Sequence, residues 1–311
     1  MAGRILVIRG GAIGDFILTL PAIGLLREAF PDARIELLGY RHIVELAVGR
    51  RYADASRSIE YGPLAGFFNP RSELDPELAA WFAEFHQVIS YLFDPDEFFA
   101  GNLRRAGVKN LILGNPKIGD HAHAAAQLAH PLQQLALYLD DPAARIFPSA
   151  ADKAAATEWL AGTKDFIALH PGSGGGDRKN WPLDRWLDLA SHLLAQNRPL
   201  LIVGGESDTA QLAALRARLP VGAVRFAEHL PLPLLAAVLA RSSLFVGHDS
   251  GISHLAAAAG APCILLFGPT DPAVWAPANP GVRVIASPDG RMDDIALDSV
   301  RAMADSVLAN A

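Results

Sequence analysis

The feature that most constrains the fold of this chain is an alternation of short β-branched runs with longer segments of helical periodicity, which is typical of βαβ units. In the first half the predicted strands are 4–8, 34–38, 57–61, 88–92 and 110–113, and the predicted helices lie near 14–29, 41–48, 74–85, 95–105 and 122–139. Strands that alternate with helices of this length predict an α/β protein with a doubly wound parallel sheet, covered by helices on both faces.

The alternation stops and then begins again, which indicates a second domain. The segment 140–149 contains two prolines after a polar start, so we expect a linker there. Beyond it the predicted strands are 166–170, 199–203, 244–246, 263–267 and 282–285, with helices near 151–161, 184–196, 208–218, 231–240 and 252–259. We therefore expect two Rossmann-like domains, residues 1–150 and 151–311. The last predicted helix, 293–309, can pack on either domain, including back on the N-terminal one.

Composition and charge exclude several classes of protein. The 311 residues are 51% hydrophobic and 19% charged, enough to bury two cores. A net charge of −6 gives no support for nucleic-acid binding through a basic face. The apolar stretch 16–26 is too short to cross a membrane, and no export signal is recognisable. The single cysteine, Cys263, lies in an apolar run, so we expect a small core residue in a cytoplasmic protein.

The first candidate site is the loop 9–15, which joins the first strand to the first helix. A dinucleotide-binding fingerprint requires glycine where Arg9 stands, and the second strand does not end in an acidic residue, so NAD binding is disfavoured. Asp15 falls in the first turn of the helix. Two interpretations of Asp15 remain open: a carboxylate that caps the helix or complements its dipole, and a general base that faces a cleft.

The second candidate site, residues 170–182, combines Gly172 and three consecutive glycines with Arg178 and Lys179. Backbone N–H groups freed by glycine, next to two cations, favour binding of a diphosphate. The spacing differs from that of a P-loop, so ATP hydrolysis is not indicated. A flexible surface loop is the alternative. His121 and His123 lack further ligands at a suitable spacing, so no metal site is expected.

The third candidate site follows the strand 199–203. Glu206 or Asp208 is placed there to accept hydrogen bonds from ribose hydroxyls. Equally, Ser207 or Asp208 is placed to cap the next helix.

The fourth candidate site runs from a strand into an apolar helix at residues 246–254. The amides of Ser250, Gly251 and Ile252 would form a helix N-terminus, which favours phosphate. Asp249 is placed either to cap that helix or to reach a sugar hydroxyl. The turn 268–272 follows the next strand, and contact with ligand and a plain type I turn are both open for it. Because all four loops follow strands, we expect them to converge on one cleft between the domains.

Together these motifs resemble glycosyltransferase family 9, the ADP-heptose:lipopolysaccharide heptosyltransferases and their relatives. The resemblance rests on Ile13-Gly14-Asp15 with Leu20-Pro21-Ala22, His170-Pro171-Gly172-Ser173 with Lys179-x-Trp181-Pro182, Asp249-Ser250-Gly251-x-Ser253-His254-Leu255, and Phe267-Gly268-Pro269-Thr270-Asp271-Pro272. It implies a GT-B fold, with the acceptor held by the N-terminal domain and the nucleotide-sugar donor by the C-terminal one.

The resemblance also implies roles for individual residues. Asp15 would be the base that deprotonates the acceptor hydroxyl, and Lys179 would offset the charge that grows on the leaving diphosphate. The implied donor-binding residues are Ser173, Glu206, Asp249, Ser250, Gly251, Ile252, His254 and Thr270. The candidates for acceptor binding are Gly14, Arg41 and Arg57, although solvated surface charge is the alternative for the arginines. No metal and no cofactor are implied at the reaction centre.

We therefore predict an inverting glycosyltransferase that moves a sugar from a nucleotide-sugar donor, heptose from ADP-heptose, to a lipopolysaccharide-core or related saccharide. The acceptor can be lipid-linked, which is compatible with peripheral association at the inner face of the inner membrane. Two alternatives remain: another GT-B nucleotide-sugar enzyme such as an epimerase, and a non-catalytic nucleotide-sugar-binding module.

Overall fold

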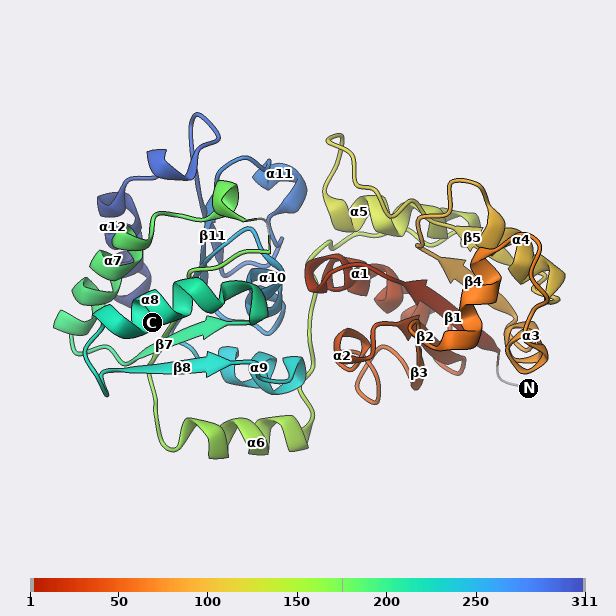
Figure 1. The fold of residues 1–311 in the computed structure, drawn as a ribbon, viewed down its shortest axis with the longest axis horizontal. Helices are drawn as coiled ribbons and strands as arrows, with labels where there is room; N and C mark the ends of the chain where they lie inside the picture. Colours follow the sequence, from red (N-terminus) through yellow and green to blue (C-terminus); the bar gives the residue numbers. More distant parts are fainter. Residues whose placement is uncertain (1–2, 175, 310–311) are drawn as a thin grey trace. The chain divides into compact units, whose positions relative to one another are not determined.

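The computed structural model describes residues 3–174 and 176–309. The contacts within the chain divide it into two compact units, Met1–Pro142 and Ala143–Ala311 (Figure 1). The division falls inside the segment 140–149, where the sequence predicts a linker. The helix α6 (Ala150–Leu160) follows this linker and packs against α9 (Leu232–Leu239) within the second unit.

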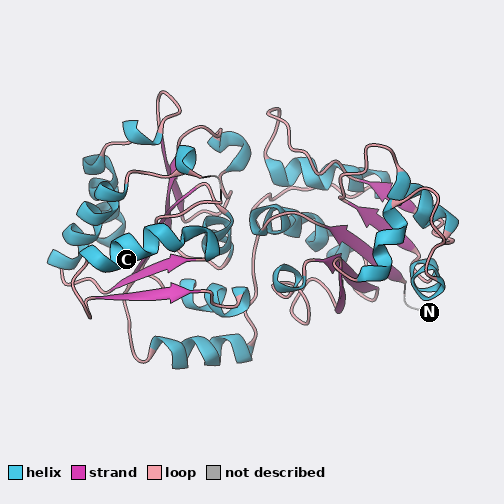
Figure 2. Ribbon diagram, in the orientation of Figure 1, coloured by secondary structure: helices cyan, strands magenta, loops and turns pink. Residues whose placement is uncertain are grey.

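The first unit is built on a five-stranded parallel sheet in the order β3-β2-β1-β4-β5. The strands are β1 (Arg4–Arg9), β2 (Arg34–Gly39), β3 (Ala55–Ser58), β4 (Gln87–Ser90) and β5 (Leu111–Leu113). The helices are α1 (Ile13–Ala29), α2 (Arg41–Val44), α3 (Pro76–Ala83), α4 (Phe98–Arg105) and α5 (Ala124–Ala129), with 3-10 turns at Gly62–Phe68 and His130–Leu135. Figure 2 shows helices flanking this sheet.

The predicted strands of the first unit are found with small shifts, whereas several helices are shorter than predicted. The strand expected at 57–61 is β3, which ends at Ser58, and the helix expected at 41–48 ends at Val44. The helix expected at 122–139 is divided, because Pro131 lacks an N–H group and its ring clashes with the preceding turn. The chain accordingly continues past Ala129 as a 3-10 turn.

The second unit contains a six-stranded parallel sheet in the order β11-β10-β9-β6-β7-β8. The strands are β6 (Ile167–His170), β7 (Leu200–Gly204), β8 (Val224–Glu228), β9 (Leu244–His248), β10 (Cys263–Phe267) and β11 (Val282–Ala286). Besides α6 and α9, the helices are α7 (Leu183–Ala195), α8 (Thr209–Arg218), α10 (Gly251–Ala258), α11 (Pro272–Trp275) and α12 (Leu297–Ala309). The central strands are buried on both faces, as expected for a covered parallel sheet.

The strand β8 was not predicted from the sequence. Its residues, Val-Arg-Phe-Ala-Glu, are only partly buried because the strand lies at the edge of the sheet beside β7. Charged residues therefore interrupt the apolar run that reveals a central strand. The prediction for Cys263 is confirmed: the side chain is buried, and burial raises the pKa of the thiol to about 12.

The last helix belongs to the second unit. Val300, Ala304, Val307 and Leu308 of α12 are buried in the same apolar cluster as Trp186. Of the two positions that the sequence left open for this helix, the structure shows packing on the second domain, where α12 contacts α7, β9 and β10. No helix within residues 3–174 and 176–309 has the length and apolar character that a membrane crossing requires.

Candidate functional site

Asp15 lies in the first turn of α1, at the carboxyl end of β1 and next to a buried arginine. Its Oδ2 accepts a hydrogen bond from the Ala12 N–H (2.9 Å), and its Oδ1 lies 3.5 Å from a guanidinium nitrogen of Arg9. Arg9 is 4% exposed and also donates to the backbone oxygens of Asp15 and Tyr91. Burial lowers the pKa of Arg9, whereas Asp15 and Tyr91 act to raise it. The Asp15 side chain is 34% exposed, so the carboxylate is fixed in place and still open to a ligand.

The turn before Asp15 requires glycine at one position. Gly11 has a φ of +98°, and a Cβ atom there would lie 2.8 Å from Asp15 Oδ2. Only glycine adopts this conformation without strain and leaves room for the carboxylate. Asp15 thus caps α1, as one of the two interpretations expected, by accepting a hydrogen bond from the Ala12 N–H. Because the side chain is partly exposed, this contact is compatible with the other interpretation, a general base.

Two candidate acceptor residues of the first unit lie on different faces of its sheet. Arg41 lines a pocket of about 470 Å³ together with Arg50, Ser56 and Ser58, near the carboxyl ends of β2 and β3. Arg57 instead stacks its guanidinium over the Trp81 ring at 4.4 Å. Neighbouring residues of a strand point to opposite faces, so Arg57 is directed away from the pocket of Arg41. Gly14 lies in the first turn of α1 beside Asp15.

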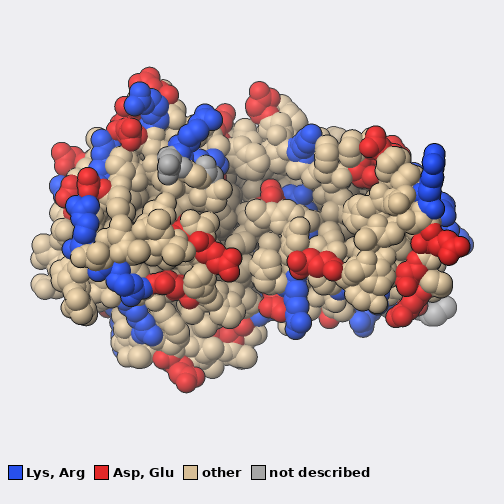
Figure 3. Space-filling view, viewed as in Figure 1, with Lys and Arg blue, Asp and Glu red and all other residues tan. Residues whose placement is uncertain are grey.

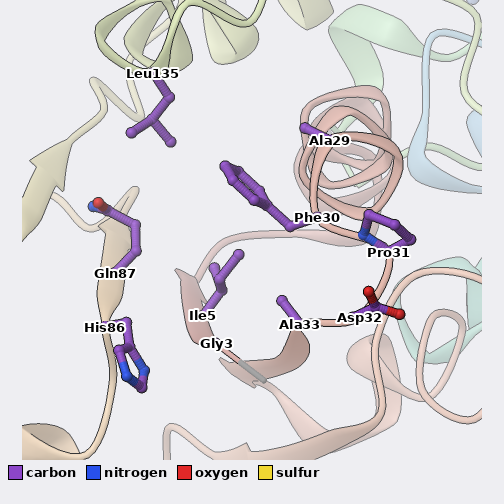
Figure 4. A pocket seen from close by; sticks show the side chains of 10 residues that line it. All are labelled: Gly3, Ile5, Ala29, Phe30, Pro31, Asp32, Ala33, His86, Gln87 and Leu135. Atoms are coloured by element: carbon purple, nitrogen blue, oxygen red, sulfur yellow. The ribbon is translucent and has the colours of Figure 1, made fainter. Parts of the chain in front are cut away.

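Another pocket of the first unit lies at the opposite end of the same sheet. It measures about 740 Å³ and is lined mainly by apolar side chains, among them Ile5, Phe30 and Leu135 (Figure 4). These residues gather around the start of β1 and the end of α1, whereas Asp15 follows the end of β1. Ligands of open α/β sheets bind beyond the carboxyl ends of the strands, so the chemistry-bearing residues and this pocket are separate features.

Lys179 of the second unit forms an ion pair that holds its ammonium group in a defined position. Its Nζ donates to Asp249 Oδ2 (2.7 Å), which also accepts from Thr270 Oγ1 (2.8 Å). The three residues come from the loops after β6, β9 and β10, at the carboxyl edge of the sheet. An ammonium group has three N–H donors, so a Lys179 side chain that is 29% exposed retains donors for an anion.

The loop after β9 forms the N-terminus of α10, as the sequence predicts. Ser250 is the N-cap, and its Oγ accepts from the Ser253 N–H (3.3 Å). Asp249 therefore does not cap this helix, because its carboxylate is turned to Lys179 and Thr270 instead. The first amides of α10, at Gly251 and Ile252, are donors that a helix cannot satisfy internally. His254 is buried, with Nε2 4.0 Å from Asp249 Oδ1.

A buried histidine fixes the loop that carries Lys179. His248 is fully buried at the end of β9, where its Nε2 accepts from the Trp181 N–H (2.9 Å) and its Nδ1 donates to the Gly172 oxygen (3.1 Å). Burial, the largest cause, lowers the pKa of His248 to about 3, so the ring is neutral at physiological pH. The two bonds tie Gly172 and Trp181, near the two ends of the loop, to the end of β9. Gly175 of the glycine triplet lies outside the described residues.

The third loop separates its two carboxylates. Asp208 is buried, accepts from the Gly205 N–H (2.9 Å), and lies 3.4 Å from His170 Nε2. Although burial opposes ionisation, the hydrogen bonds from His170 and Gly205 hold the pKa of Asp208 below its usual range. Glu206 is exposed. Of the two residues considered for a ribose, only Glu206 is accessible, and its role stays a prediction.

The side chain of Ser173 forms a hydrogen bond within its own loop. It is 5% exposed, and its Oγ donates to Asn180 Oδ1 (2.8 Å). Its predicted contact with phosphate stays a prediction. Thr270 is not a free turn residue, since it donates to Asp249, while its neighbour Asp271 caps α11 by accepting from the Ala273 N–H (2.8 Å).

Sequence reasoning gave no role to Arg9, His170 and His248. Each is the last residue of a buried strand, β1, β6 and β9 respectively. A charged or imidazole side chain at that position, directly before the loop that follows the strand, is the signal that would have revealed them. No group of His, Cys, Asp and Glu side chains in residues 3–174 and 176–309 is arranged to hold a metal ion.

Comparison with solved structures defines the class of this fold. A glycosyltransferase family 9 protein from Veillonella parvula matches with a TM-score of 0.81 at 19% identity, covering 99% of this chain and 98% of that one. E. coli heptosyltransferase WaaC, solved with ADP, matches with a TM-score of 0.72 at 18% identity over 98% of this chain and 99% of that one. The chain thus has the GT-B fold, and the prediction of two Rossmann-like parallel sheets is confirmed.

The sequence match identifies the family within that class. The model of glycosyltransferase family 9 (heptosyltransferase) matches residues 115–300, more than half of the chain, so this chain belongs to that family. Lipooligosaccharide heptosyltransferase 2 of Haemophilus influenzae is 29% identical over 137 residues, which are 43% of this chain and 40% of that protein. The chain therefore aligns with less than half the length of that relative.

Proposed function

We propose that this protein is an inverting glycosyltransferase that transfers heptose from ADP-heptose to a saccharide of the lipopolysaccharide core or a related acceptor. The observation that carries the proposal is the placement of Lys179 by Asp249 and Thr270 at the strand edge from which α10 begins. A cation and a helix N-terminus at one sheet edge suit the diphosphate of a nucleotide sugar. Membership of the heptosyltransferase family and the ADP named with the E. coli structure support heptose and ADP as the donor's parts.

The second unit would hold the donor and stabilise its leaving group. The amides of Gly251 and Ile252, with Ser250 and Ser173, would bind the phosphate oxygens, and the exposed Glu206 would bind the ribose. When the bond between the anomeric carbon and the phosphate oxygen breaks, negative charge grows on the diphosphate, and Lys179 would offset it. Preorganised charge of this kind stabilises a transition state strongly, because it needs no reorganisation during the reaction. Asp249 and His254 would position the transferred sugar or its loop.

The first unit would supply the base. Asp15 would remove the proton from the acceptor hydroxyl as its oxygen attacks the anomeric carbon, and the diphosphate would leave from the opposite face with inversion. Arg9 holds the Asp15 carboxylate in place. Arg41 and the pocket that it lines with Arg50 would bind an acidic group of the acceptor. No step in this scheme requires a metal ion, and the protein would act at the inner face of the inner membrane, where a lipid-linked acceptor is accessible.

The proposal is tested by incubating the protein with ADP-, UDP-, GDP- and dTDP-sugars and a deacylated core saccharide, with and without a chelator. We expect transfer from ADP-heptose, inversion of the anomeric configuration and no loss of activity with the chelator. Sugar modification without any acceptor would instead favour an epimerase. Binding of the nucleotide sugar without turnover would favour a non-catalytic binding module.

Asp15→Asn tests the assignment of the base. Because general-base catalysis contributes about 10²- to 10⁴-fold, the rate of transfer should fall by a factor in that range while donor affinity is kept. The exposed Asp32, also in the first unit, provides the control Asp32→Asn, which should leave the rate unchanged. A rate for Asp15→Asn within threefold of wild type would show that another group takes the proton.

A further inference from the structure

The guanidinium of Arg9 connects the loop after β4 to the first turn of α1. Its Nη1 donates to the Tyr91 oxygen (3.3 Å), and its Nη2 donates to the backbone oxygen of Asp15 (3.4 Å). The same Nη2 lies 3.5 Å from Asp15 Oδ1. Because Nη2 carries two N–H groups, it can serve the backbone oxygen and Oδ1 at once. Arg9 therefore contacts both the main chain and the carboxylate of the residue that the proposed function makes the base.

Arg9 is too deeply buried to touch a substrate. Its side chain is 3% exposed, whereas that of Asp15 is 34% exposed. Its Nε is buried and, within residues 3–174 and 176–309, has no hydrogen-bond partner. A buried charge is costly unless it is paired, and Asp15 supplies the opposite charge. An effect of Arg9 on the chemistry therefore has to pass through Asp15.

Two separate contacts hold the two oxygens of the Asp15 carboxylate. The Ala12 N–H donates to Oδ2 (2.9 Å), and Arg9 Nη2 faces Oδ1. With one contact alone the carboxylate could still turn about its Cβ–Cγ bond, because the terminal torsion of aspartate has only a broad preference. The second contact fixes the plane of the carboxylate. Loss of the Arg9 contact would leave this plane to the Ala12 hydrogen bond alone.

The position of Arg9 is in turn fixed by the neighbouring strand. The Tyr91 N–H donates to the Ile8 oxygen (2.9 Å), and the Tyr91 hydroxyl donates to the Leu128 oxygen of α5 (2.8 Å). These bonds hold the Tyr91 oxygen that accepts from Arg9 Nη1. Because a guanidinium presents its N–H groups as a rigid planar fork, an anchored Nη1 also sets the direction of Nη2. A lysine ammonium at this position cannot reproduce both contacts.

We propose that Arg9 is a positioning residue for the transfer reaction, whose guanidinium fixes the plane of the Asp15 carboxylate so that one oxygen faces the acceptor hydroxyl. This inference rests on the proposed function, because Asp15 must be the base. The hydroxyl gives its proton to Asp15 as its oxygen attacks the anomeric carbon, and Arg9 exchanges no proton. A general base must lie within hydrogen-bond reach of the proton that it takes, and a displacement of about 1 Å can cost about 100-fold in rate.

The test is steady-state kinetics of the 311-residue chain with ADP-heptose and a deacylated core saccharide. Arg9→Lys keeps the positive charge but loses the fork that contacts Tyr91 and Asp15. We expect kcat to fall by about 10- to 100-fold. The KM for ADP-heptose should stay within about twofold of the wild type, since the second unit would bind the donor. If charge alone mattered, Arg9→Lys would keep the wild-type kcat, which would overturn the proposal.

A double variant separates positioning from a purely structural role. If Arg9 acts through Asp15, nothing is left for it to position once Asp15→Asn has removed the base. Arg9→Lys/Asp15→Asn should therefore react as fast as Asp15→Asn alone, within about twofold. A structural role would multiply the two losses, so a double variant about 10-fold or more slower than Asp15→Asn would overturn the proposal.

Arg4→Lys is the matched control, because Arg4 lies at the opposite end of the same strand and pairs with Glu36 (2.7 Å). Its kcat should stay within about twofold of the wild type. If Arg9→Lys fails to fold, Arg9→Gln is the second variant, because it removes the buried charge and keeps N–H donors. The same loss of kcat, and the same absence of a further loss with Asp15→Asn, are expected for it.

The outcomes distinguish this inference from the proposed function. Transfer by the wild type, a slow Asp15→Asn and an unchanged kcat of a folded Arg9 variant would overturn the positioning role and leave the base assignment intact. A rate of Asp15→Asn close to that of the wild type would contradict the base and this inference together. Absence of transfer by the wild type would contradict the proposed function and, with it, a role of Arg9 in this reaction.

Discussion

His248 illustrates how one residue can set the shape of a whole site. Its ring makes two hydrogen bonds, to the Gly172 oxygen and from the Trp181 N–H, and packs edge-on against Trp186 with 5.2 Å between the ring centroids. The neutral ring is what the site requires, because Nε2 must accept while Nδ1 donates. A protonated ring would turn Nε2 into a donor facing the Trp181 N–H.

This requirement predicts a pH dependence of stability. Burial lowers the pKa of His248 from 6.5 to about 3 in the folded state, so below pH 6.5 the unfolded state binds a proton that the folded state does not. The free energy of unfolding should therefore fall as the pH drops from about 6.5 to about 3, by up to about 1.4 kcal/mol per pH unit. Urea unfolding of the wild type and of His248→Gln at several pH values measures this, and the variant should have a shallower slope by about one proton. Equal slopes in the two proteins would contradict the neutral ring.

Asp208 makes a second contribution to the pH dependence of the free energy of unfolding, at lower pH. Its pKa is lowered in the folded state, so the stability that it contributes is present above its unfolded value and is lost as the pH falls through the folded one. This loss begins near the unfolded pKa of 3.8, where the contribution of His248 is still changing. The two effects therefore overlap at the acid end of the His248 range.

At the scale of elements, the loops that follow the strands are shaped by close contacts as much as by charge. The loop after β6 passes so near to the third loop that a Cβ atom on Gly172 would lie 1.8 Å from Asp208 Oδ1. Gly174, two residues further on, has no atom within 4 Å of such a Cβ. A side chain is therefore excluded at Gly172 by the neighbouring loop but not at Gly174. The spacing of the glycines in the sequence does not reveal this difference.

Gly172→Ala should displace either the loop or the buried Asp208, at a cost of about 3 kcal/mol in the free energy of unfolding. ADP affinity should fall with it, since the loop carries Lys179. Gly174→Ala is the matched control and should change stability by less than about 0.5 kcal/mol. Denaturant unfolding and ADP titration of the two variants provide the comparison. Similar behaviour of both would show that the loop adapts without cost.

For the whole molecule, the main result is that each unit has its own sheet and its own core, and that the last helix belongs to the second. Val300 of α12 is fully buried, whereas the Asp298 side chain on the same helix is 95% exposed. On the face that Figure 3 shows, basic and acidic side chains are interspersed over both units, in keeping with a net charge of −6 spread along the chain.

Val300→Asp tests this assignment. A carboxylate in the apolar cluster should destabilise the second unit by about 4 kcal/mol or more, and ADP binding should be lost although α12 carries no proposed site residue. Asp298→Asn should be neutral within about 0.5 kcal/mol. The fluorescence of Trp181 and Trp186, both in the affected cluster, reports the unfolding. Normal stability of Val300→Asp would mean that α12 is not part of this core.

Sequence alone determined the two parallel sheets, the loops that carry the candidate residues and the family. These depend on local periodicity and on short motifs, which are properties of neighbouring residues. The prediction of secondary structure from the sequence failed in two places. The strand β8 was missed because it lies at the sheet edge and is only partly buried, and the helix expected at 122–139 was predicted too long because Pro131 interrupts it.

Only the tertiary structure decided which side chains meet. It paired Lys179 with Asp249, 70 positions apart, turned Asp208 inward to His170 while leaving Glu206 exposed, placed Arg9 against Asp15, and directed Arg57 away from Arg41. Such pairings depend on strand order and on close contacts between distant loops, as at Gly172 and Asp208. A one-dimensional pattern predicts that a residue follows a strand, but strand order and loop packing decide what that residue touches.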